Sequence, residues 1–171
     1  NKKFTINNID PIHLVALIES LGRMNANLKV RKKSITVMPS KKIICTNVET
    51  APHPGFPTDL QAQMMALMSL ADGTSTIVEK IFENRFMHVS ELNRLGANIK
   101  TKNDTAIIQG NRVFKGAEVM ASDLRASVSL ILAAICSKGE SVIHRVYHLD
   151  RGYEKIEETL GKCGPIMTRE K

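Results

Sequence analysis

Apolar residues recur at helical spacing in two long stretches of the chain that resemble each other. Residues 59–71 carry apolar side chains on one helical period, namely Leu60, Met64, Leu67, Met68 and Ala71. Asp59 opens this stretch and Gly73 follows it, as expected at the two ends of a helix. Residues 123–137 repeat the pattern, but the run from Val128 to Ile135 is apolar almost all round. The spacing predicts a helix over each stretch, and we expect the second to be buried on every side.

Stretches rich in β-branched residues follow each of these helices. Residues 74–82 (TSTIVEKIF) and 140–148 (ESVIHRVYH) are typical of strands. A shorter helix is predicted after each strand, from Val89 in one case and around Ile156 in the other, and two short strands flank turn residues in 99–110. The predicted unit is therefore α-β-α-β-β.

An incomplete copy of this unit precedes the two that are nearly complete. Pro11 stands at the start of a helical stripe of apolar side chains, namely Leu14, Leu17, Ile18 and Leu21. Two strand-like runs around a turn follow over 28–39, and Leu21, Leu92 and Leu160 occupy the same place in successive copies. The repeat is therefore about 70 residues long. It is too long for a solenoid, and it predicts three similar lobes around shared helices.

The sequence is interpreted as a single α/β domain over residues 1–171. The 43 % apolar content allows a substantial core, and no linker or low-complexity segment divides the chain. The Pro-rich stretch 50–58 (TAPHPGFPT) is expected to be an ordered loop that leads into the first long helix. Pro165 stands where the other copies have Ala26 or Ala97, so we expect the final strand to be irregular.

Acidic and basic residues recur at corresponding places in the two nearly complete units. Asp59 and Asp123 stand where a long helix begins, whereas Arg85 and Arg151 each follow a strand. Each position has a purely structural interpretation, because an Asp at a helix start is often a cap and an Arg in a turn is often a solvated surface charge. Equivalent helix starts and turns of a lobed domain point toward one face, however, so we expect these side chains to converge.

Arg125 adds a third guanidinium, in the first turn of the second long helix. A cation placed there works against the helix macrodipole, and an anionic ligand would give the placement a reason. Two carboxylates beside three guanidiniums suit proton transfer next to a bound phosphate or carboxylate, because arginines bind the anion and a carboxylate accepts the proton. The sequence contains no Gly-rich phosphate loop, so the site would be built from side chains and helix ends.

Composition and charge narrow the classes of function. The net charge of +7 predicts attraction to anions, whereas the lack of Trp and the 4 % aromatic content argue against nucleic-acid recognition. Three cysteines without CxxC spacing indicate free thiols in a reducing compartment, and the histidines form no metal-binding motif. The longest apolar run is too short to cross a bilayer, and no segment resembles a signal peptide. We therefore expect a cytoplasmic protein without a metal site and without nucleic-acid or membrane partners.

The repeated charged residues lie in four long motifs. These are TAPHPGFPTDLQAQ (50–63), IFENRFMHVSELNRLGAN (81–98), ASDLRAS (121–127) and YHLDRGYEKIEETL (147–160). They closely resemble the UDP-N-acetylglucosamine 1-carboxyvinyltransferases, which belong to the enolpyruvyl transferases. The resemblance extends over the whole chain, and the long, nearly unbroken motifs make it specific.

This resemblance implies a reaction and a fold. The enolpyruvyl group of phosphoenolpyruvate would be transferred to the 3-hydroxyl of UDP-N-acetylglucosamine with release of phosphate, which commits the sugar to the peptidoglycan of the cell wall. Each of two similar domains would be an inside-out α/β barrel of three repeated units, with the active site between them. This chain would be the second domain, and the missing first domain would bring a mobile loop with a reactive cysteine. The resemblance implies no metal and no organic cofactor, and the chain alone is expected to be inactive.

The resemblance also implies roles for individual residues. Asp59 would contact the sugar 3-hydroxyl and remove its proton, and Asp123 would help to move protons during addition and elimination. Three arginines would hold the phosphate and carboxylate of phosphoenolpyruvate, and the backbone at Ile81 would contact the nucleotide sugar. The implied catalytic residues are Asp59, Asp123 and Arg151, and the implied substrate-binding residues are Asp59, Ile81, Phe82, Arg85, Arg125 and Arg151.

Two alternatives stay open on the sequence alone. The sister enzyme 3-phosphoshikimate 1-carboxyvinyltransferase shares the fold and the lobed repeat, although its turn differs from YHLDRGYE. A non-catalytic domain that only binds anions would account for the positive charge equally well.

Overall fold

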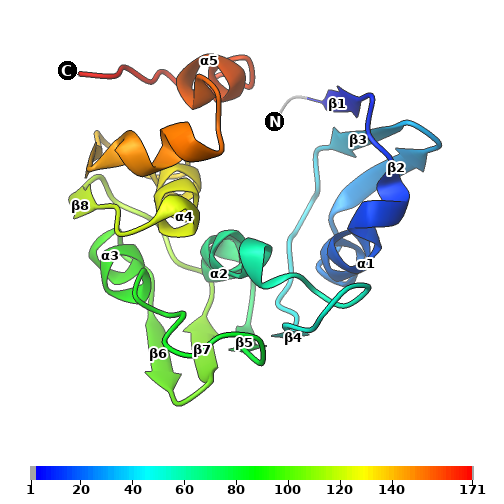
Figure 1. Cartoon of the computed structure of the whole chain (residues 1–171), viewed down its shortest axis with the longest axis horizontal. Helices are drawn as coiled ribbons and strands as arrows, with labels where there is room; N and C mark the ends of the chain where they lie inside the picture. The colour runs from blue at the N-terminus through cyan, green and yellow to red at the C-terminus, as the bar shows by residue number, and fades with distance from the viewer. Residues whose placement is uncertain (1–2, 171) are drawn as a thin grey trace.

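Three small sheets, each packed against helices, follow one another around an arc in the computed structural model (Figure 1). The structure describes residues 3–170. We call residues 3–47 the first lobe, residues 48–117 the second lobe and residues 118–170 the third lobe. The elements in chain order are β1 (Phe4–Asn7), the 3-10 helix η1 (Pro11–Leu14), α1 (Val15–Arg23), β2 (Asn27–Arg31), β3 (Ser34–Met38), β4 (Val48–Glu49), the 3-10 helix η2 (Thr58–Leu60), α2 (Gln61–Leu70), β5 (Thr74–Val78), α3 (Val89–Arg94), β6 (Ile99–Lys102), β7 (Thr105–Gln109), β8 (Glu118–Met120), α4 (Leu124–Ile135), β9 (Val142–His144), the 3-10 helix η3 (Val146–Arg151) and α5 (Ile156–Gly161).

The second lobe is built around a strand–helix–strand crossover. The short strand β4 pairs in parallel with β5, and α2 connects the two because parallel strands cannot be joined by a tight turn. β5 also pairs with β7 of the β6–β7 hairpin, which gives the strand order β4-β5-β7-β6. The helix predicted over residues 59–71 is confirmed as η2 and α2. The apolar side chains that α2 buries are Ala62, Met64, Met65, Ala66 and Met68.

The third lobe repeats this crossover. β8 pairs in parallel with β9, and α4 connects them. α4 lies beside α2, so the two crossover helices are neighbours at the middle of the arc (Figure 1). Residues 162–170 contain no strand, as expected from the position of Pro165. A small core joins α4 to η3 and α5, and its buried members are Val128, Ile131, Leu149 and Ile156.

The first lobe consists of the antiparallel sheet β1-β3-β2 and the helical segment η1–α1. Asp10 caps this segment, because its Oδ1 accepts a hydrogen bond from the backbone N–H of Ile12 at 3.4 Å. Pro11 occupies the first helical position, where its missing N–H costs nothing. The helix start predicted at Pro11 is therefore confirmed.

Two predicted strands are shorter than expected, because the chain turns away from its sheet in each. β5 ends at Val78, since the Glu79 carboxylate accepts hydrogen bonds from the backbone N–H groups of Ile81 and Phe82 and closes a turn. β9 contains only three residues, because Arg145 adopts a left-handed conformation with φ 59° and the chain enters η3. Both turns lead directly to the arginines that the sequence singled out.

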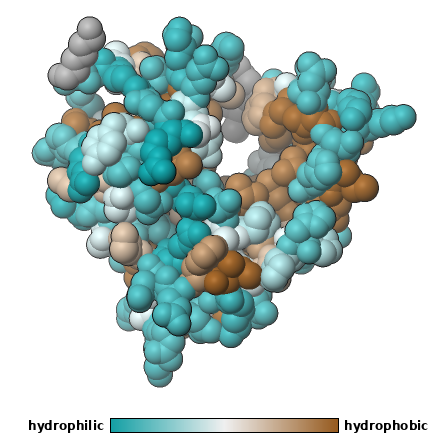
Figure 2. Space-filling view, viewed as in Figure 1, coloured by the Kyte–Doolittle hydropathy of each residue, from teal (hydrophilic) through white to brown (hydrophobic). Residues whose placement is uncertain are grey.

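An apolar groove of about 450 Å³ lies between α1, α2 and α4. Leu132 and Ile135 of α4 line it, and Ile135 is 36 % exposed. The expectation that α4 would be buried on every side is therefore wrong for this face, because α1 and α2 do not close over it. Figure 2 shows apolar surface gathered over α1 beside a hollow in the molecule. Over residues 3–170, no helix combines the length and apolarity that crossing a membrane would need.

Candidate active site

The N-terminal ends of the two crossover helices meet through an ion pair. Asp59 lies in η2 just ahead of α2, and Arg125 lies in the first turn of α4. Arg125 Nε donates a hydrogen bond to Asp59 Oδ1 at 2.5 Å. The Asp59 side chain is 64 % exposed and that of Arg125 is 36 % exposed, so both remain accessible to a ligand. The Asp59 carboxylate also offsets the unfavourable position of a guanidinium at a helix N-terminus.

Asp123 is the N-cap of α4. Its Oδ1 accepts hydrogen bonds from the backbone N–H groups of Arg125 at 2.8 Å and Ala126 at 3.1 Å. Partial burial of the carboxyl opposes its ionisation. The two backbone hydrogen bonds and one from the Ser122 hydroxyl outweigh this effect and hold the pKa of Asp123 below its ordinary value. Asp123 is therefore ionised at neutral pH, and its cap fixes the backbone from which Arg125 projects.

Arg85 is held against an aromatic ring in the turn that follows β5. Its guanidinium carbon lies 4.5 Å from the centre of the Phe82 ring, a cation–π arrangement. Asn84 adopts φ 54°, a left-handed conformation that Asn tolerates better than most residues and that redirects the chain before Arg85. The Arg85 Nε atom is buried and has no hydrogen-bond partner among residues 3–170. A buried donor without a partner is unusual in a native protein and marks this guanidinium as a candidate for a functional role.

His88 is buried at the start of α3, a helix that contacts α4 and β8 of the third lobe. Its pKa is lowered to about 4, chiefly because burial disfavours the charged imidazolium. The nearby Asp123 carboxylate opposes this shift, and the Arg85 guanidinium adds to it. Both charges therefore act on the imidazole. His88 is neutral at neutral pH, and its Nε2 has no partner among the described residues.

Glu79 joins the loop before α2 to the turn after β5. The residue is buried, and its carboxylate accepts four hydrogen bonds. The donors are the hydroxyls of Thr50 and Thr58 and the backbone N–H groups of Ile81 and Phe82. The expectation of an ordered loop over residues 50–58 is thereby confirmed.

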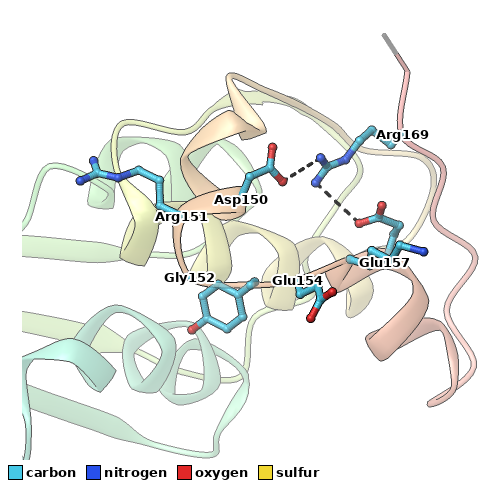
Figure 3. Close-up of a pocket in the computed structure, with 8 residues that line it drawn as sticks. Asp150, Arg151, Gly152, Glu154, Glu157 and Arg169 are labelled. Carbon is cyan, nitrogen blue, oxygen red and sulfur yellow. Dashed lines mark hydrogen bonds and ion pairs between the residues drawn. The ribbon is translucent and has the colours of Figure 1, made fainter.

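Arg151 lies at the end of η3 and is exposed. A Cβ atom at the adjacent Gly152 would lie 3.0 Å from Cδ2 of Leu124, so this turn packs against the first turn of α4. Asp150 pairs instead with Arg169 at 2.7 Å, in a polar pocket of about 510 Å³. Figure 3 shows the Arg151 side chain leaving the turn on the side away from Arg169. Within residues 3–170, Arg151 makes no ion pair, which leaves its charge available to a ligand.

The residues selected from the sequence are Asp59, Ile81, Phe82, Arg85, Asp123, Arg125 and Arg151. Contacts join Asp59 to Arg125, whose backbone N–H donates to Asp123, and join Arg85 to Phe82. Arg151 lies in the turn that packs against the first turn of α4. Glu79 and His88 were not among the residues predicted from the sequence. The signal for Glu79 was an acid closing an apolar β-branched run, whereas His88 sits in a polar stretch that gives no hint of burial. Over residues 3–170, no three or more His, Cys, Asp or Glu side chains are grouped so as to hold a metal ion.

A match to a family model decides what kind of protein this neighbourhood belongs to. Residues 1–160 match the model of EPSP synthase (3-phosphoshikimate 1-carboxyvinyltransferase). The chain belongs to the EPSP synthase family. The resemblance to enolpyruvyl transferases seen in the four sequence motifs is thereby confirmed.

Curated relatives indicate a branch of the EPSP synthase family. The chain is 52 % identical over 167 residues to the UDP-N-acetylglucosamine 1-carboxyvinyltransferase of Bartonella quintana, and the match covers 96 % of the chain and 39 % of that protein. It is 51 % identical over 172 residues to the protein of that name from Aliarcobacter butzleri, covering 100 % of the chain and 41 % of the relative. The chain therefore spans about 40 % of the length of the curated relatives it matches.

Solved structures of the family have the same fold. The enolpyruvyl transferase NikO from Streptomyces tendae superposes with a TM-score of 0.88 at 26 % identity, over 96 % of this chain and 39 % of that one. EPSP synthase from Acinetobacter baumannii gives a TM-score of 0.77 at 17 % identity, over 99 % of this chain and 43 % of that one. The second likeness concerns the fold alone. Together they confirm the predicted α/β fold of the enolpyruvyl transferases.

Proposed function

We propose that this chain forms one half of the active-site cleft of a UDP-N-acetylglucosamine 1-carboxyvinyltransferase. The enzyme would transfer the enolpyruvyl group of phosphoenolpyruvate to the 3-hydroxyl of UDP-N-acetylglucosamine and release phosphate, the first committed step of peptidoglycan synthesis. Residues 1–171 would correspond to its second domain, and the first domain would complete the cleft. The names of relatives at 51–52 % identity support this choice of substrates.

One observation carries the proposal: acidic and basic side chains from the two crossover helices meet at their N-terminal ends. The Asp59–Arg125 pair joins segments far apart in the chain, and both side chains are accessible. In the proposed mechanism, Asp59 accepts the proton of the sugar 3-hydroxyl as the hydroxyl oxygen bonds to C2 of phosphoenolpyruvate and C3 takes up a proton. Phosphate then leaves C2 as C3 gives up a proton, which restores the double bond. Arg125 holds the Asp59 carboxylate in place for that transfer through their ion pair.

Arginines supply the charge that the donor requires. Phosphoenolpyruvate carries a phosphate and a carboxylate, and planar guanidinium groups bind both through paired hydrogen bonds. The orphan Nε of Arg85 and the unpaired charge of Arg151 support the proposal that these two arginines act with Arg125. Because Asp123 is ionised at neutral pH, it would enter the reaction as a proton acceptor. Phe82 supports Arg85, and Ile81 and Phe82 would contact the nucleotide sugar.

The three described cysteines are free, which supports a cytoplasmic, reducing location. The proposal includes no metal and no organic cofactor, because side-chain carboxylates and guanidiniums address both the proton transfer and the anionic donor.

The proposal is tested in a full-length enzyme. These 171 residues replace the matched segment of the Aliarcobacter butzleri relative, and we call the product the full-length chimera. It is expected to release phosphate from phosphoenolpyruvate when UDP-N-acetylglucosamine is present. Asp59→Asn is expected to lower kcat by about 100-fold or more, because the amide cannot accept the proton. Phosphate release is followed by a coupled colour assay, and circular dichroism checks that the variant is folded.

Controls separate the alternatives. The unmodified relative sets the reference rate, and shikimate 3-phosphate as the acceptor tests the sister activity. A folded chimera that is inactive with the nucleotide sugar but active with shikimate 3-phosphate would overturn the choice of acceptor. The isolated chain is expected to release no phosphate, and turnover by this chain alone would contradict the assignment to half of a cleft.

A further inference from the structure

We propose that Glu79 is a positioning residue that sets the distance between the proposed base and the proposed anion-binding turn. The inference rests on the proposed function, since it concerns how that site is held together. Glu79 touches neither substrate in the proposed site. It acts through the two segments that its carboxylate connects.

The carboxylate of Glu79 is saturated with hydrogen bonds from both segments. Oε1 accepts from Thr50 Oγ1 at 2.8 Å, from Ile81 N at 2.9 Å and from Phe82 N at 3.1 Å. Oε2 accepts from Thr58 Oγ1 at 2.9 Å. The residue is only 4 % exposed. Because all four donors bond to one buried side chain, they are fixed relative to one another.

Each oxygen of Glu79 leads to a different part of the proposed site. Thr58 is the first residue of η2 and precedes Asp59, so the bond to Oε2 fixes the turn that carries the proposed base. The bond from Phe82 N to Oε1 fixes the backbone of Phe82. The ring of Phe82 in turn supports the Arg85 guanidinium, whose carbon lies 4.5 Å from the ring centre. A single side chain therefore links the base to an anion-binding arginine.

The third lobe shows whether the repeated fold itself needs a buried acid at the position of Glu79. Arg145 precedes Arg151 by the same number of positions as Glu79 precedes Arg85. Arg145 is exposed and donates to the Tyr147 hydroxyl, and it makes no contact equivalent to those of Glu79. The repeated fold thus forms without a buried acid at this place. Burying a carboxylate is costly unless it is fully hydrogen-bonded, which favours a reason beyond packing for its presence.

Paired variants of Glu79 in the full-length chimera test the inference. Glu79→Ala removes the acceptor and is expected to lower kcat per folded molecule about 10-fold and to raise KM for phosphoenolpyruvate about 10-fold. Glu79→Gln keeps a carbonyl oxygen at Oε1 and an amide that can donate to Thr58, so both constants are expected within about threefold of the unmodified chimera. A role in folding alone would lower the yield of folded enzyme without changing either constant.

A second pair of variants isolates the link to the proposed base. Thr58→Val replaces the hydroxyl by a methyl group and is expected to lower kcat about fivefold with an unchanged KM for phosphoenolpyruvate. Thr58→Ser keeps the hydroxyl and is expected to match the unmodified chimera. This pair decides the matter if Glu79→Ala does not fold.

The possible outcomes are distinct. Unchanged kcat and KM in folded Glu79→Ala, or equal kcat in Thr58→Val and Thr58→Ser, would overturn the positioning role. Lack of phosphate release by the unmodified chimera would instead mean that the proposed function has failed. The inference is supported if kcat falls and KM for phosphoenolpyruvate rises in Glu79→Ala while both constants stay near those of the unmodified chimera in Glu79→Gln.

Discussion

The second and third lobes share one architecture but use corresponding residues differently. Asp59 and Asp123 both stand at the start of a crossover helix, yet only Asp123 caps its helix. Asp59 makes no cap, and its exposed carboxylate reaches Arg125 of the neighbouring lobe. Duplication has placed both acids at one end of the helix pair. The local hydrogen bonds then determine which carboxylate caps its own helix and which pairs with the neighbouring lobe.

The two turns that follow the crossover diverge in the same way. Arg85 is half-buried and rests on the Phe82 ring, and Glu79 closes the turn that presents it. Arg151 is exposed and lacks such a support, in a turn whose corresponding residue is the exposed Arg145. The second lobe therefore offers a preorganised guanidinium, whereas the third offers one that a ligand must order. Preorganised groups lose less entropy on binding, which predicts unequal contributions from the two arginines.

The largest expected difference between the lobes appears at acid pH. Burial lowers the pKa of His88 in the second lobe from 6.5 to about 4. Between these two pH values, His88 therefore binds a proton in the unfolded state but not in the native state. Stability should fall as the pH drops through this window, by about 2 to 3 kcal/mol between pH 7 and pH 4.5. The stretch after Arg151 instead carries the exposed Glu154 and Lys155. Urea unfolding of the full-length chimera at several pH values measures the loss.

Two non-titrating substitutions control for packing effects at His88. His88→Gln and His88→Leu differ in polarity but cannot bind the proton, so both should remove the His88 part of the pH dependence whatever their stability at pH 7. Hydrogen exchange at pH 4.5 should show the turn after β5 opening before the turn after β9. Stability curves of the variants that run parallel to that of the unmodified chimera would refute this assignment.

An intermediate effect is expected from exchanging each arginine for lysine. Arg85→Lys loses the planar stack on Phe82 and the fork of donors, so we expect KM for phosphoenolpyruvate to rise about 10-fold. Arg151→Lys keeps the charge of a side chain that has no aromatic ring to rest on, so we expect KM for phosphoenolpyruvate to rise only about threefold. Steady-state kinetics of the full-length chimera measure both. Equal increases in KM would show that the support given by Phe82 adds nothing to binding.

Much of the fold could be predicted from the sequence because the spacing of apolar residues shows the repeat. The helix over residues 59–71 and the start at Pro11 follow from periodicity and capping, which are local properties. The early end of β5 could not be predicted, because the Glu79 carboxylate that closes the turn is itself bound by two threonines from another segment. Local propensity favoured a longer strand, and tertiary hydrogen bonds overrode it.

The candidate site was predictable in its members but not in its contacts. Corresponding positions in the repeat selected Asp59, Asp123, Arg85 and Arg151 without any knowledge of distance. No pattern in the sequence shows that Arg125 binds Asp59 across two lobes, since the contact depends on how α2 and α4 pack side by side. Burial of the polar residue His88 was likewise invisible, because its neighbours come from separate segments.

The smallest expected effect separates the two acids by stability. Asp123→Ala removes the cap of α4 and should cost about 1 kcal/mol, whereas Asp123→Asn should cost much less because Asn caps nearly as well. Asp59→Ala removes an exposed ion pair and should cost less than about 0.5 kcal/mol. Since the pKa of Asp123 is lowered from 3.8 in the native state, its charge stabilises the fold above that value. This advantage over Asn should disappear as the pH falls through the native pKa. Urea unfolding and hydrogen exchange of the first-turn amides of α4 measure the loss of stability in each variant and its dependence on pH. An equal loss of stability in Asp123→Ala and Asp59→Ala would mean that the two helix starts have not diverged.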